Sequence, residues 1–281
     1  MGKPQIRGLE MTAYNDPLIV LAGGFLTLLL LRMLIGYKPR KKCQAGGAVI
    51  DTSEELGLTT VAWKNQEFLA FLTSAVGPTN VGEEACRLAD ERILDCFHKK
   101  ETFETGPDFL KRCILDSHRL ISEHGSSQSG GCSIALVYIK EGQLHWASSG
   151  DISIYLNRDK LMRLNQRDLY KFRLREKILS GQISEKRVFS NTLKNELTSY
   201  LGYENLKRFE TSQRPVKLRK SDHLLLCSRQ ADEGLTQIEK ERLLNQRKAT
   251  DEKVTDFCTR LKQQGDQHRK LGFLIIEKFR T

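Results

Sequence analysis

The residues that could take part in chemistry are charged side chains, and no complete catalytic motif accompanies them. The 281 residues contain no nucleophile elbow, P-loop, HExxH helix or GxGxxG loop. Carboxylates are the ligands that hard divalent cations prefer, so acidic side chains could hold a metal ion. Guanidinium and ammonium groups could instead bind a phosphorylated or acidic segment. The acidic candidates are Asp51, Glu67, Asp232 and Glu233, and the basic candidates are Arg229, Arg269 and Lys270.

Composition narrows the class of protein. The content is 39% hydrophobic and 28% charged, which is typical of a folded domain with a sizeable core. Lys and Arg total 45 against 35 Asp and Glu, and this balance favours anionic surfaces such as membranes or nucleic acid. Aromatic residues make up only 7%, without the Arg-interleaved pattern of single-strand binding, so nucleic acid is not the expected partner. Seven cysteines without a CxxC pair indicate a reducing compartment rather than disulfides or zinc.

An apolar run begins at Pro17 and ends at Gly36, with Arg32 as its only charge. About 20 helical residues span a bilayer core of roughly 30 Å, so the run predicts a transmembrane helix. The tyrosine and basic cluster of residues 37–42 predict an interface anchor. The excess of basic residues is greater after the run than before it. We therefore expect a single-pass protein whose large domain faces the cytoplasm or an equivalent interior. A buried core helix is the less favoured alternative, and a cleaved signal peptide lacks its basic front and cleavage site.

The periodicity of the rest predicts strands and helices in alternation. Strands are expected at residues 58–72 (two strands around a turn), 133–139, 143–148, 152–157, 160–164, 222–227 and 271–279. Helices are expected at residues 82–98, 107–124, 169–180, 238–245 and 252–263. The four strands between residues 133 and 164 read as one continuous β-meander. Antiparallel runs with helices between them predict an α+β sandwich with the helices outside.

Four segments occur together in the order and spacing of a known family. They are VGEEACRLADE at residues 81–91, the meander of residues 130–168 with Gly150-Asp151, LTSYLG at residues 197–202, and DHLLLCS at residues 222–228. These resemble the aGEvASrlA, vGDSR, LTralG and gDxlLLcSDG motifs of the metal-dependent type-2C (PPM) serine/threonine phosphatases. The resemblance implies a β-sandwich of two antiparallel sheets flanked by helices. The expected organisation is a tail at residues 1–16, a transmembrane helix at 17–36, a basic linker at 37–47 and the phosphatase-like domain at 48–281.

The resemblance also implies where metal ligands would lie. Active members of the family hold two divalent metals with carboxylates, and the metals activate a bridging water. Carried over position by position, the Asp-Gly of the DGMGG turn falls on Ser74 and Ala75, the Asp-Gly of the SDG motif falls on Arg229 and Gln230, and the terminal Asp-Asn falls near Arg269 and Lys270. The acid of the first motif stays ambiguous between Asp51 and Glu67. We therefore expect no metal and no other cofactor, and we take Arg229, Arg269 and Lys270 as candidate anion-binding residues.

These replacements predict a catalytically inactive, membrane-anchored phosphatase-like protein. It would act through a protein partner, as a scaffold or as a regulatory or structural subunit of a membrane complex. One alternative is an active metal-dependent serine/threonine phosphatase with displaced ligands, in which Asp232 or Glu233 refills the position of Arg229. The other alternative is a basic, membrane-tethered module that binds anionic lipid or nucleic acid.

Overall fold

The computed structural model describes residues 44–50, 59–124, 130–170, 178–180, 196–204, 206, 208–263 and 271–277. The description below concerns these residues, which belong to the unit formed by residues 42–281. In this part of the chain, no helix has the length and the apolar character needed to cross a membrane. The predicted span at residues 17–36 lies outside the described residues, as do Asp51, Arg269, Lys270 and most of the helix expected at 169–180.

Two antiparallel sheets form the centre of this unit. Sheet A has the strand order β1-β11-β10-β6-β7, and sheet B has the order β2-β3-β4-β5-β8, with β9 paired to β5. The strands of sheet A are β1 (Gln44–Ile50), β6 (Ser153–Asn157), β7 (Leu161–Arg163), β10 (His223–Cys227) and β11 (Leu271–Glu277). The strands of sheet B are β2 (Thr59–Lys64), β3 (Glu67–Val76), β4 (Gly131–Lys140), β5 (Gln143–Ser149), β8 (Glu210–Thr211) and β9 (Val216–Lys217).

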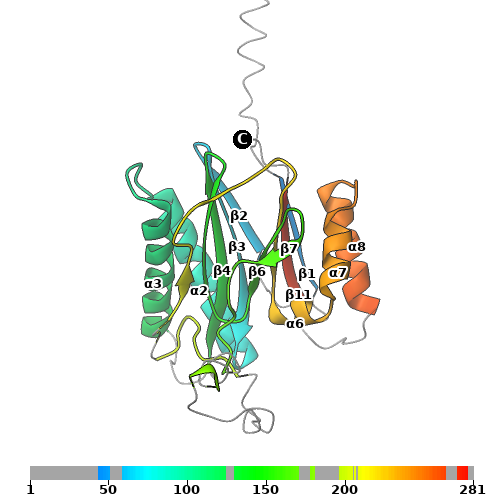
Figure 1. Ribbon diagram of the computed structural model, residues 1–281. Coiled ribbons are helices and arrows are strands. Elements are labelled where there is room, and N and C mark those ends of the chain that lie inside the picture. Colours follow the sequence, from blue (N-terminus) through cyan, green and yellow to red (C-terminus); the bar gives the residue numbers. More distant parts are fainter. Residues whose placement is uncertain are drawn as a thin grey trace, which may run out of the picture. The chain divides into compact units, whose positions relative to one another are not determined.

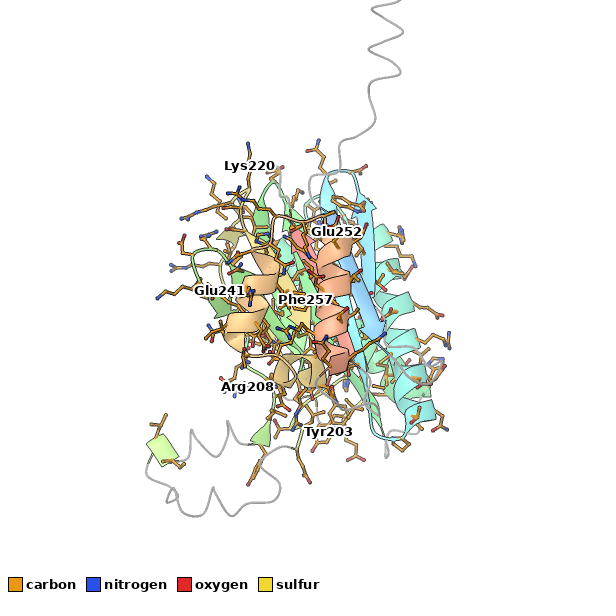
Figure 2. The ribbon with its side chains drawn as sticks, turned by 90° about the vertical axis from the view of Figure 1, so that its right-hand side faces the viewer. Tyr203, Arg208, Lys220, Glu241, Glu252 and Phe257 are labelled. Atoms are coloured by element: carbon orange, nitrogen blue, oxygen red, sulfur yellow. The ribbon has the colours of Figure 1, made fainter. Side chains whose placement is uncertain are left out.

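Helices cover the outer faces of both sheets (Figure 1). Helices α2 (Thr79–His98) and α3 (Gly106–His124) pack on sheet B, and α7 (Gln237–Leu244) and α8 (Thr250–Gln263) pack on sheet A. Figure 2 shows α7 and α8 in front of sheet A, with Phe257 on α8. The Phe257 ring stacks on Phe273 of β11 at 5.2 Å between ring centroids, which fixes α8 against the sheet. The short helix α6 (Arg229–Glu233) directly follows β10.

Alternation along the strands explains this layering. In β3, Leu69 and Phe71 face the core under α2 and α3, whereas Phe68 and Leu72 face the core between the sheets. Successive side chains of a strand point to opposite faces, so a strand covered on both faces is apolar throughout. A third core joins β10 and β11 to α7 and α8. The predicted α+β sandwich of two antiparallel sheets flanked by helices is confirmed.

The expected continuous meander is wrong between β5 and β6. Strand β5 belongs to sheet B and β6 to sheet A, so the chain crosses between the sheets at Gly150. Gly150 has φ +104°, and a Cβ at this position would lie 2.2 Å from Ser133 Oγ. Only glycine fits such a crowded, left-handed position. The crossing is held by Asp168, whose Oδ2 accepts from the Gly150 N–H at 3.0 Å. Strand β1 starts at Gln44, inside the stretch that we expected to be linker.

Candidate functional site

One end of the sandwich gathers the positions where the resemblance places metal ligands. Strands β3, β5 and β10 end here, and β11 begins here. Ser74 and Ala75 lie near the end of β3, where they pair with Ser133 and Cys132 of β4. Ser74 is a neutral residue at a place where the family has a carboxylate. The chain then turns through Gly77, which has φ +90°, into helix α2.

Arg229 is the first residue of α6 at the same end. Ser228 fixes this start, because its Oγ accepts from the N–H of Ala231 at 3.5 Å and from that of Gly272 at 3.0 Å. The N–H of Ser228 in turn donates to the Gly272 carbonyl at 2.8 Å, which ties the end of β10 to β11. The Arg229 side chain reaches forward along the helix, and its Nε donates to Glu233 Oε1 at 3.3 Å. Gln230, which follows it in α6, is half-buried.

Glu67 does not belong to this site. It is the first residue of β3, whereas Ser74 is near the last, and seven residues of strand span roughly 23 Å. The Glu67 carboxylate pairs with Lys140 Nζ at 3.0 Å and with Lys100 Nζ at 3.5 Å. Its role is therefore that of an ion-pair partner at the far end of the sheet. Asp51 is the other candidate for the first motif, and it lies outside the described residues.

Asp232 forms the centre of a buried polar network that the sequence did not reveal. Its Oδ2 accepts from Ser153 Oγ at 2.9 Å and from Arg163 Nη2 at 3.0 Å, and its Oδ1 accepts from the Tyr155 hydroxyl at 2.7 Å. Lys240 also donates to Oδ1. Burial would raise the pKa of Asp232, but the Lys240 ammonium and the other donors hold the pKa of this carboxyl below its usual value. These partners come from β6, β7 and α7, and no local motif joins them.

Two further cations lie beside this network. Arg167 Nη1 is 3.6 Å from Asp232 Oδ2 and 3.2 Å from Glu233 Oε1, the same oxygen that Arg229 contacts. Arg167 is 7% exposed, and within the described residues its Nε has no hydrogen-bond partner. Burial raises the pKa of Asp151, and the nearby guanidiniums of Arg229 and Arg167 act in the opposite direction. The site is therefore rich in arginine at the place where the resemblance implies a metal.

A divalent-metal centre does not fit the residues at the matched positions. Ser74 carries no charge and Arg229 carries a positive one, which repels a cation by several kcal/mol (~4 per unit charge at 4 Å and an effective dielectric of 20). Asp232 cannot refill the position, since its two oxygens already accept from four side chains. Within the described ranges, no three His, Cys, Asp or Glu residues form a group that could hold a metal ion.

Comparisons with known proteins point to one kind of protein. No protein-family model matches the chain. The serine/threonine phosphatase stp of Listeria innocua is 22% identical over 222 residues, which cover 76% of this chain and 86% of that protein. The solved serine/threonine phosphatase of S. agalactiae matches with a TM-score of 0.72 at 19% identity, over 84% of this chain and 99% of that one. The PPM Ser-Thr phosphatase MsPP of Mycobacterium smegmatis matches with a TM-score of 0.65 at 15% identity, over 83% and 97%.

These comparisons correct the expectation of an inactive scaffold. All three proteins are named as phosphatases, and the likeness extends over most of each of them. The expectation that the chain is not an enzyme rested on the replaced positions alone, Ser74 and Arg229 among them. The findings favour the alternative, an active phosphatase, over the scaffold.

At these identities the solved structures establish the fold. The two sheets and the helix pair over each sheet are the architecture that the four sequence segments predict, whereas the crossing between the sheets at Gly150 was not predicted. The chain therefore has the fold of the PPM-type serine/threonine phosphatases.

Proposed function

We propose that the chain is a phosphatase that acts on phosphoserine or phosphothreonine in proteins. The observation that supports this most is the match to the S. agalactiae serine/threonine phosphatase, which extends over 84% of this chain and 99% of that one. The Listeria innocua relative, which covers 76% of this chain, supports the same reaction class. A phosphorylated protein segment is then the partner that the end of the sandwich would receive.

Asp151 is an acidic residue of the matched motifs that is retained at this end of the sandwich. It follows Gly150 at the crossing between the sheets, it is 8% exposed, and its N–H donates to Ser133 Oγ at 3.4 Å. Its carboxyl is close enough to Arg229 and Arg167 for both to favour the ionised form. We propose that the charge of Asp151 helps to hold these two guanidiniums at this end of the sandwich.

The test is phosphate release by the full chain from phosphoserine and phosphothreonine peptides. Parallel reactions contain Mn²⁺, Mg²⁺ or a chelator, so that turnover that needs a metal is distinguished from turnover that does not. Asp151→Asn is the site variant, and Glu252→Gln, at an exposed position of α8, is the matched control. We expect release in at least one condition, reduced by Asp151→Asn and unchanged by Glu252→Gln. No release in any condition contradicts the proposed phosphatase activity. Release that Asp151→Asn leaves unchanged contradicts the proposed role of Asp151.

We also propose that the enzyme is tethered to a membrane. The apolar run from Pro17 to Gly36 and the basic cluster after it support a single span with the phosphatase domain on the cytoplasmic or equivalent side. Tethering restricts the enzyme to phosphoproteins at or near that membrane surface.

A further inference from the structure

A single carboxylate oxygen holds two arginines at the end of the sandwich. Glu233 Oε1 lies 3.2 Å from Arg167 Nη1 and 3.3 Å from Arg229 Nε. The Glu233 side chain is 45% exposed, whereas those of Arg167 and Arg229 are 7% and 22% exposed. The anion is thus the outermost member of the group, and it lies over two cations that are more buried than itself. A partly exposed ion pair of this kind is weak, so another anion can compete with Glu233.

Cationic side chains are concentrated in this group. Its described ion pairs join four of them, Arg163, Arg167, Arg229 and Lys240, to two carboxylates, Asp232 and Glu233. Such a concentration of guanidinium and ammonium groups attracts anions.

Arg167 also has donor capacity that the fold leaves unused. A guanidinium carries five N–H donors in a planar fork. Arg167 Nε is buried and, among the described residues, has no partner, although a buried donor left without one costs about 1 to 3 kcal/mol. Such an unsatisfied donor in an arginine-rich group is what an incoming oxyanion would satisfy.

A phosphomonoester suits this geometry better than the carboxylate does. It carries close to two negative charges and three terminal oxygens, and guanidinium forks bind such oxygens in bidentate fashion. We propose that Glu233 occupies the place of a phosphoryl group, and that a phosphorylated serine or threonine displaces it and binds to Arg167 and Arg229 without a metal. This inference rests on the proposed function for the choice of phosphoserine and phosphothreonine. In this site the two arginines would supply the positive charge that metal ions supply in a site built from carboxylates.

The test is fluorescence anisotropy of a labelled phosphoserine peptide with the full chain in the presence of EDTA. The unphosphorylated peptide is the reference ligand. Glu233→Gln removes the competing charge at a half-exposed position, and we expect it to tighten phosphopeptide binding about five-fold. Arg229→Gln is expected to weaken it about ten-fold or more, as for loss of a charge-assisted contact. Glu252→Gln makes the same charge change as Glu233→Gln on α8 and is expected to alter nothing.

The outcomes separate this inference from the proposed function. Phosphate-dependent binding in EDTA that Glu233→Gln strengthens supports the arginine site, even if no turnover is found. Binding that needs Mn²⁺ or Mg²⁺ and disappears with EDTA overturns the arginine site, even if turnover is found. Equal affinities for the wild type, Glu233→Gln and Glu252→Gln overturn it as well. Circular dichroism of each variant shows that a loss of binding is not a loss of fold.

Discussion

Asp232 shows how one residue can organise a site built from distant segments. Its carboxylate joins the β6 residues Ser153 and Tyr155 to Arg163 of β7 and Lys240 of α7. A buried ion pair adds little net stability when it is compared with well-packed apolar residues. Removing one partner is costly, because the opposite charge is left buried and unpaired.

Asp232→Asn should therefore destabilise the domain strongly. The substitution keeps the shape but leaves the buried Lys240 ammonium without its anion, and we expect a loss of about 3 to 5 kcal/mol in the free energy of unfolding. Asp256→Asn is the matched control, because its pair with Lys248 is partly exposed and is expected to contribute less than about 1 kcal/mol. Urea denaturation of the full chain compares the two variants. Equal losses would show that the Asp232 network is not a stabilising centre.

The matched motifs named some residues that the structure brings together and missed others. Ser74 and Arg229 lie at the same end of the sandwich. The contact of Arg167 with Glu233 could not be predicted, because the two residues are far apart in sequence and no repeated spacing joins them. A tertiary ion pair between a loop and a helix leaves no periodic signal. Glu67 was a candidate because its local sequence resembles the first motif of the family. Strand β3 instead places Glu67 at the end of the sheet opposite to Ser74.

At the scale of elements, helices were predictable because their apolar residues follow a helical period. The helices expected at residues 82–98 and 107–124 match α2 and α3, which begin at Thr79 and Gly106. Strands β2 to β7, β10 and β11 were predicted with similar bounds, whereas β1, β8 and β9 were not predicted. The sheet to which each strand belongs was not predicted either. A short segment between two apolar strands looks the same whether the chain turns back or crosses to a second sheet. Only the crowding around Gly150 distinguishes the two, and that is a tertiary property.

A second buried cluster fastens helix α8 to strand β11. Glu277 Oε2 accepts from Lys253 Nζ at 2.5 Å and lies 3.2 Å from His223 Nε2, while its Oε1 accepts from Thr250 Oγ1 at 2.6 Å. Burial would raise the pKa of Glu277, but these donors outweigh it and lower the pKa from 4.5 to about 2. The ionised form of this carboxyl is thus the one that the fold stabilises.

The attachment of α8 should consequently weaken in acid. Because the pKa of Glu277 is lower in the folded state, its contribution is complete above pH 4.5 and is lost as the pH falls towards 2. The difference amounts to about 3 kcal/mol in the free energy of unfolding. Urea denaturation between pH 6 and pH 2.5 should show this loss in the wild type, and Glu277→Gln should flatten the curve over that range. The control variant Glu252→Gln is expected to lose stability in acid as the wild type does. If the free energy of unfolding of Glu277→Gln also falls with pH as in the wild type, other carboxyls cause the acid sensitivity.

At the scale of the whole molecule, charge and hydropathy predict an attachment that the described residues do not include. The net charge is +10, and a basic cluster at residues 37–42 directly follows the apolar run. Basic residues beside a span are attracted to anionic lipid and orient the segment. A tethered phosphatase meets its substrates within the reach of its linker, so the membrane would define its range of phosphoproteins.

The full chain should therefore stay with membranes after alkaline carbonate extraction. An arginine in the middle of a span costs about 2.5 to 3.5 kcal/mol, so the double variant Leu26→Arg, Leu28→Arg should move the protein to the supernatant. A control variant with two substitutions to arginine at exposed lysines, Lys111→Arg and Lys217→Arg, keeps the span intact and should leave the protein in the pellet. Protease added to sealed vesicles should digest the phosphatase domain only when it has access to the cytoplasmic face. Release of the wild-type chain by carbonate would show that the apolar run does not span a membrane, and the basic cluster alone would then account for any binding to vesicles.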